Sequence, residues 1–122
     1  MAIRSFAGPG EVEAVAGRLS EEIQGSAMSC ELVDSVRRST AGGDTLYVMV
    51  FEKYYMRAGN RASLTVSVCA GPDGHIHVDA IGAGGGQGPI FKFSWGAEED
   101  FTDSVAAVLQ PLGFWDEEGT DP

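Results

Sequence analysis

The stretch TLYVMVFEKYYMRAGNRASLTVSVCAGPDGHIHVDAIGAGGGQG, residues 45–88, decides the fold, because it holds three runs of strand-forming residues and ends in a run of glycines. Its first run, residues 46–56, consists almost entirely of β-branched, aromatic and long apolar side chains. Glu52 and Lys53 are the only charges in it. A strand this apolar is expected to be central in a sheet, with both faces covered.

The two runs that follow alternate between apolar and polar side chains, which predicts strands with one buried face. They occupy residues 62–69 and 75–81. Turn sequences lie before each of them, RAGN at residues 57–60 and GPDG at residues 71–74. Both contain residues that tolerate positive φ, so the three strands are expected to run antiparallel.

A fourth strand is predicted over residues 29–40, where the alternation is imperfect. Cys30, Leu32 and Val36 are expected on one side and mostly polar residues on the other, as in a half-exposed strand at or near a sheet edge. Residues 29–81 therefore predict a four-stranded antiparallel meander.

Two segments outside the meander have the apolar spacing of amphipathic helices. The first follows Pro9, which suits the first turn of a helix, and Gly25 is expected to end it in the left-handed conformation. The second begins near the acidic residues 98–100, and Pro111 ends or kinks it. The predicted apolar stripes are Val12, Val15, Ala16, Leu19 and Ile23 in the first helix, and Phe101, Val105, Val108, Leu109 and Leu112 in the second.

Short apolar runs at residues 3–7 and 90–95 are further candidate strands. The predicted fold class is α+β: a two-layer domain with an antiparallel sheet of four to five strands, in the order β-α-β-β-β-β-α, and two helices packed on one face. Residues 1–115 are expected to form this single domain, and residues 116–122 an acidic, flexible tail.

The formal net charge of −10 on 122 residues argues against nucleic acids and anionic membrane surfaces as partners. No apolar run approaches the ~20 residues of a membrane span. The first residues lack the pattern of a signal peptide, so we expect a cytoplasmic protein. In that compartment Cys30 and Cys69 are expected to be reduced.

Five glycines fall within residues 82–88. The run has neither the Lys-Ser/Thr pair of a P-loop nor a helix directly after it. Its first interpretation is a sharp bend or a close approach of two backbones, for example at a subunit contact, and its second is a ligand-binding loop. The candidate ligand-binding residues in this segment are Gly84, Gly85, Gly86 and Gln87.

His75, His77 and Asp79 alternate along one predicted strand, so their side chains are expected on one face, about 7 Å apart in successive pairs. This row is a weak candidate for a catalytic site, because imidazole and carboxylate groups transfer protons and bind divalent metals. A complete metal site would need further ligands, such as Glu52 or Asp34. The same alternation is typical of a solvated sheet face, and we predict no bound metal and no cofactor.

Aromatic and donor side chains gather near the tip of the first hairpin, at Tyr54, Tyr55, Arg57, Asn60 and Arg61. They are suited to a small organic or anionic ligand. They are equally suited to a self-complementary interface, where Tyr and Arg are enriched. An uncovered sheet face is expected to expose Tyr47, Met49, Phe51 and Tyr55, which favours a homodimer.

The blocks FEKYYMR, NRASL and AIGAGGGQG, followed by FKFSWG, resemble those of an uncharacterised family of small bacterial proteins that contain a domain of unknown function. The order of elements is also similar to the TATA-binding-protein-like, or helix-grip, architecture, in which a curved antiparallel sheet wraps a long helix. Neither resemblance implies an activity.

Two hypotheses on function follow from these patterns. The preferred one is a non-enzymatic binding or assembly module, homodimeric through its sheet and its glycine-rich loop. The alternative is a small metal-dependent or acid–base enzyme that uses His75, His77 and Asp79.

Overall fold

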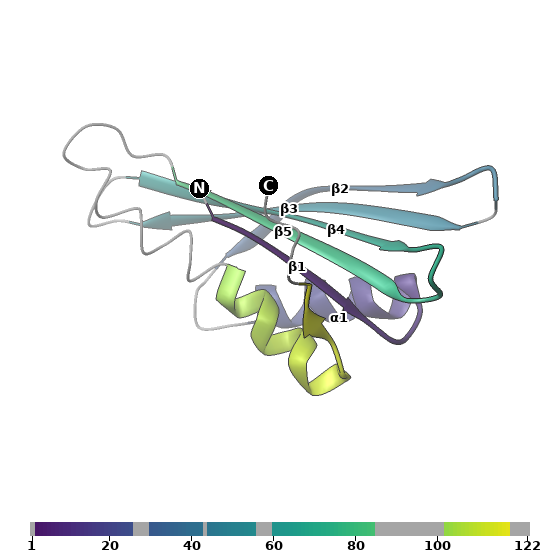
Figure 1. Ribbon diagram of the computed structural model, residues 1–122. Helices are drawn as coiled ribbons and strands as arrows, with labels where there is room; N and C mark the ends of the chain where they lie inside the picture. Colours follow the sequence, from purple (N-terminus) through teal and green to yellow (C-terminus); the bar gives the residue numbers. More distant parts are fainter. Residues whose placement is uncertain (1, 26–29, 43, 56–59, 85–101, 118–122) are drawn as a thin grey trace.

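The computed structural model describes residues 2–25, 30–42, 44–55, 60–84 and 102–117 (Figure 1). Several predicted features lie outside these residues. They are the candidate strand at 90–95, the tip residue Arg57, and Gly85, Gly86 and Gln87 of the glycine run.

Within these residues the sheet has six antiparallel strands: β1 (Ala2–Gly8), β2 (Glu31–Ser39), β3 (Thr45–Tyr55), β4 (Asn60–Ala70), β5 (Ile76–Gly84) and β6 (Trp115–Asp116). Their order across the sheet is β2-β3-β4-β5-β1-β6. The predicted α+β class and the meander from β2 to β5 are confirmed. The predicted number and order of strands are wrong, because the short β6 follows the second helix and pairs with β1.

One face of the sheet is covered by two helices (Figure 1). They are α1 (Val12–Gln24) and a second helix, described over residues 102–109, which continues into the 3-10 turn η2 (Gln110–Leu112). Pro111 lies in that turn, as the sequence predicted. Gly25 ends α1 with φ of −86°, so the expected left-handed conformation is wrong.

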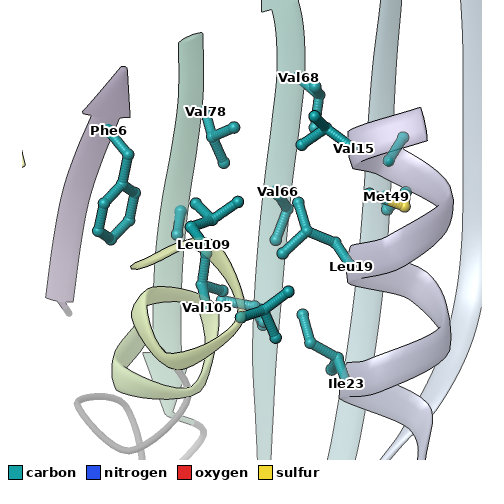
Figure 2. Close-up of a cluster of buried hydrophobic side chains, with 14 of the residues drawn as sticks. Phe6, Val15, Leu19, Ile23, Met49, Val66, Val68, Val78, Val105 and Leu109 are labelled. Atoms are coloured by element: carbon teal, nitrogen blue, oxygen red, sulfur yellow. The ribbon is translucent and has the colours of Figure 1, made fainter. Parts of the chain in front are cut away.

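The core lies between the sheet and the helices (Figure 2). All five residues of the predicted α1 stripe are buried, and so are alternate residues of β4 and β5. The second helix contributes Val105 and Leu109, which are both fully buried. The sheet contributes Phe6, Phe51, Leu64, Val66, Val68 and Val78.

The expected orientation of β3 is inverted. Met49 and Phe51, which we expected on an uncovered face, are 2% and 0% exposed beneath the helices. Leu46, Val48 and Val50 point to the other face and are only half-buried. Because both sets are apolar, the sequence does not distinguish the two faces of this strand.

A bulge changes the faces of β2. The pairing of β2 with β3 shifts between Leu32 and Asp34, where Val33 is the extra residue. Leu32 pairs with Phe51 on the helical face, whereas Val36 pairs with Val48 on the opposite face. The expectation that Leu32 and Val36 share a side is therefore wrong. The position of β2 at the edge of the sheet is confirmed.

Candidate functional site

The sheet face opposite the two described helices is the main candidate surface. We call it the open face and define it by these side chains, which share this side in the strand pairing: Ile3, Ser5, Asp34, Val36, Arg38, Leu46, Val48, Val50, Thr65, Ser67, Cys69, His77, Asp79 and Ile81. Three apolar residues of this face are exposed: Val36 of the edge strand β2 (49%), and the directly paired Ile3 of β1 (63%) and Ile81 of β5 (37%). Hydroxyl groups and Asp79 lie between them.

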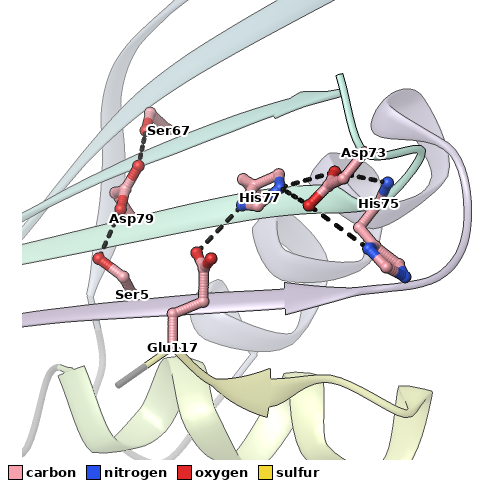
Figure 3. A network of polar contacts seen from close by, with 7 residues as sticks. All are labelled: Ser5, Ser67, Asp73, His75, His77, Asp79 and Glu117. Atoms are coloured by element: carbon pink, nitrogen blue, oxygen red, sulfur yellow. Dashed lines mark hydrogen bonds and ion pairs between the residues drawn. The ribbon is translucent and has the colours of Figure 1, made fainter. Parts of the chain in front are cut away.

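Asp79 is held by hydroxyl groups from both neighbouring strands (Figure 3). Ser5 Oγ of β1 donates to Asp79 Oδ1 at 2.6 Å, and Ser67 Oγ of β4 donates to Oδ2 at 3.5 Å. Both carboxylate oxygens therefore have a partner on the sheet. The arrangement balances a half-buried charge on the open face.

His77 lies between two carboxylates (Figure 3). Its Nδ1 is 3.0 Å from Glu117 Oε1, and its Nε2 is 3.1 Å from both oxygens of Asp73. Hydrogen bonds to Glu117, and then to Asp73, raise the pKa of His77 above its ordinary value. The imidazolium form can donate from both nitrogens here. Neither nitrogen is then free to act as a base.

His75 does not belong to the predicted row. It precedes β5 in the turn, with Nδ1 3.5 Å from Asp73 Oδ2, and its ring contacts Trp115 edge-on at 5.2 Å. The backbone N–H of His75 also donates to Asp73 Oδ1, at 3.0 Å. That bond, followed by the bond from His77, lowers the pKa of Asp73 to about 2.

His75 and His77 thus share Asp73 as a partner, whereas Asp79 is bonded to Ser5 and Ser67. Within the part of the chain that the structure describes, no group of three or more His, Cys, Asp or Glu side chains is placed to hold a metal ion. Sequence reasoning missed Asp73 and Glu117, which hold His77. Asp73 is a typical turn residue, and Glu117 reaches His77 only through the position of β6, so neither had a usable signal.

The hairpin-tip candidates are placed in part. Arg61 is exposed, and its Nη1 lies 3.4 Å from Glu52 Oε1. Along the backbone, Tyr54 pairs with Arg61 and Tyr55 with Asn60. The structure does not describe the side chains of the two tyrosines and of Asn60. Gly84 ends β5, opposite Ala62.

Two surface depressions lie elsewhere. One, of about 270 Å³, lies beside the start of α1 and Leu112. The other, of about 600 Å³, lies between the start of α1 and the β4–β5 turn and has an acidic rim that includes Glu11, Glu13 and Asp44. Neither is lined by a residue that the sequence predicted as catalytic or ligand-binding.

The outer edge of β2 is the second candidate surface. Nearly all of its nine residues are exposed. Arg37 forms an ion pair with Glu13 of α1. Asp34 accepts only the N–H of Ser35, at 2.8 Å, and Arg38 makes no hydrogen bond or ion pair with any residue that the structure describes. At this edge, Asp34 and Arg38 therefore have hydrogen-bonding capacity that no described residue uses.

The comparisons with known proteins identify a family but no activity. A model described as a family of unknown function (DUF6054) matches residues 1–113. The match confirms the predicted resemblance to an uncharacterised family. No curated protein matches the chain significantly. None of the helices in the described ranges combines the length and apolar character that crossing a membrane requires.

Proposed function

We propose that this chain, which belongs to DUF6054, a family of unknown function, is a non-enzymatic assembly module that associates with a second copy of itself through its sheet. The observation that carries the proposal is the one-sided cover of the sheet. Both described helices pack on one face, and Val36, Ile81 and Ile3 remain exposed on the other. Apolar side chains at such a surface favour a protein partner.

The bonding of the histidines supports assembly over catalysis. A general base needs one nitrogen that can reach a substrate. The two nitrogens of His77 already face Glu117 and Asp73, and Asp79 is bonded to two serines. The alternative, an enzyme that uses His75, His77 and Asp79, would require these contacts to break first.

The glycine-rich segment remains part of the proposed contact, because glycines allow two backbones to approach closely. A small anionic ligand at the hairpin tip remains a proposal as well, with Arg61 as its described cation. We also propose a cytoplasmic location, which is supported by the two free cysteines, Cys30 and Cys69.

Sedimentation velocity over a range of protein concentrations, combined with native mass spectrometry, tests the proposal. We expect a concentration-dependent dimer without bound metal. A monomer at every concentration would overturn self-association. A retained metal ion, lost in the His77→Ala variant, would favour the enzyme instead.

A further inference from the structure

We propose that two copies of the chain join edge to edge through β2, antiparallel about a two-fold axis at Val36, so that their two sheets become one. This inference rests on the proposed self-association and assigns it to one strand and one register, in which Val36 lies in the contact and Ile3 and Ile81 stay exposed on the joined open face. The partner is a second copy of this chain.

The β2 edge is accessible and long. It is the outer strand of the sheet, far from the edge that carries β6 (Figure 1). It spans nine residues, and its side chains are exposed except for that of Leu32, which is half-buried. The regular part of the strand, 34–39, pairs with β3 without interruption. An unpaired strand of this kind is a template for another strand.

The charges of β2 are ordered so that an antiparallel copy complements them. Glu31 and Asp34 lie in its first half, and Arg37 and Arg38 in its second half. The four charges sum to zero on a chain of net charge −10. Long-range repulsion opposes contact between two acidic molecules. This repulsion is weakest where the two molecules meet through a strand whose own charges sum to zero.

A two-fold axis at Val36 places each Asp34 opposite the Arg38 of the other copy. Val36 then faces its own equivalent between two ion pairs. All three side chains lie on the same face, because Asp34, Val36 and Arg38 pair with Val50, Val48 and Leu46 of β3. A two-fold axis perpendicular to the sheet preserves that face. The open faces of the two copies therefore become continuous.

The backbone is consistent with this register. The N–H of Ser35 donates to Asp34 Oδ1, which indicates that it points outward, because an amide inside the β2–β3 ladder would bond to a β3 carbonyl. Outward groups recur every second residue, so those of Arg37 also face out. With the axis at Val36, Ser35 stands opposite the second copy's Arg37. These two residues exchange hydrogen bonds, and Asp34 is released to bind Arg38.

Neighbouring registers are less favourable. An axis at Asp34, Arg37 or Arg38 places two like charges directly opposite each other, which is destabilising. An axis at Ser35 pairs Asp34 with Val36 and leaves Arg38 opposite Leu32. An axis that falls between two residues is excluded. It would place a residue whose backbone groups point outward opposite one whose groups point toward β3, and these two cannot exchange hydrogen bonds.

Charge exchange between two variants tests the pairing. D34R alone and R38D alone each place like charges opposite each other twice, so we expect their dimer dissociation constants to rise by about tenfold or more. An equimolar mixture of D34R and R38D restores opposite charges at both positions and is expected to form a heterodimer. E22R and R18D make the same charge changes on exposed positions of α1 and are expected to dimerise like the parent. Circular dichroism checks that each variant is folded.

Disulfide trapping tests the register in a Cys69→Ser background. Val36→Cys brings two cysteines together at the axis, where non-hydrogen-bonded pairs have Cα atoms about 4.5 Å apart. We expect it to crosslink on mild oxidation. Ser35→Cys places its two cysteines about 8 Å apart, beyond the reach of a disulfide.

The outcomes separate the two proposals. A dimer that crosslinks through Ser35→Cys but not Val36→Cys, or that is unchanged by D34R and R38D, would overturn the β2 register and leave self-association in place. A parent chain that stays monomeric would overturn both.

Discussion

The two edges of the sheet are finished in different ways. At one edge, β6 pairs with β1, Glu117 N–H donates to the carbonyl oxygen of Ser5 at 2.9 Å, and Arg4 bonds to both Asp103 and Asp116. At the other edge, β2 presents exposed residues to solvent. The chain itself covers the end of β1 at the first edge, whereas within the described residues no strand pairs with the outer side of β2. We therefore expect changes at the first edge to alter stability, and changes at the second to alter the proposed association.

Removing the anchor of the closed edge should have the largest effect. Phe114 directly precedes β6 and is 5% exposed in the core. Phe114→Ala is expected to lower the free energy of unfolding by about 3–5 kcal/mol, because it leaves a large cavity. Urea unfolding followed by circular dichroism measures this. Trp115→Ala, at a residue that is 48% exposed, is the control and should cost about 1 kcal/mol or less. Equal losses for the two variants would contradict the role of Phe114 as anchor.

A smaller loss is expected where the closed edge is tightly packed. A Cβ on Gly8, the last residue of β1, would lie 2.3 Å from the ring of Phe114. Gly8→Ala should therefore destabilise the protein by about 1–3 kcal/mol, measured as a drop in melting temperature. At Gly17 in α1 an added Cβ would meet no atom of another element within 4 Å, so Gly17→Ala should instead raise stability by about 1 kcal/mol. A neutral Gly8→Ala variant would show that Phe114 can move.

The contact of Glu117 with His77 should make the closed edge sensitive to pH. The hydrogen bonds of His77 to Glu117 and Asp73 raise the pKa of His77 in the folded state. The stability that these bonds contribute is therefore fully present below the ordinary pKa of 6.5 and is lost as the pH rises through the folded-state pKa. Urea unfolding from pH 6 upward should therefore show a decline in the parent that is reduced in His77→Gln. Parallel curves for the two proteins would contradict this linkage.

Asp73 has the opposite dependence. Its folded pKa of about 2 is lowered, so its contribution is present above its ordinary value of 3.8 and lost as pH falls toward 2. Asp73→Asn should remove this acid-sensitive part and leave the Glu117 contact with His77. Resolved histidine resonances in NMR titrations of the variant distinguish the two effects, because His77 should keep a raised pKa.

The smallest effect on stability is expected at the open edge. Val36→Thr keeps the β-branched shape at a residue that is 49% exposed, so the monomer should change by about 0.5 kcal/mol or less. The measurement belongs at low protein concentrations, where the proposed dimer is expected to dissociate. Val66→Thr is the matched control on the covered face. It buries a hydroxyl at a fully buried position and should cost about 1–3 kcal/mol. A large loss in Val36→Thr would show that β2 is part of the monomer core.

Elements with one clear period could be predicted from the sequence. In α1 and β4, each residue of the apolar set is buried, because only one helical stripe or one strand face carries apolar side chains. The inverted faces of β3 had a different cause. When both faces of a strand are apolar, the sequence does not show which set of alternate residues points toward the helices.

Other errors came from features shorter than a period. The bulge at Val33 shifts the alternation of β2 by one residue, which moved Val36 to the open face. Two residues are too few to give β6 a pattern, and its pairing with β1 depends on where the second helix ends. The expected geometry of the histidine row also differs, while its role as a site stays a prediction. The turn holds His75 outside β5, so the predicted spacing did not continue through it.

The position of β1 between β5 and β6 has a consequence for synthesis. The meander from β2 to β5 joins neighbours in the chain and can form while the ribosome is still translating the rest. Residues 2–8, although made first, must wait for residues 76–82 and then for residues 115–116. Such distant pairings slow folding. A nascent chain therefore keeps its first strand without a partner until β5 has been made.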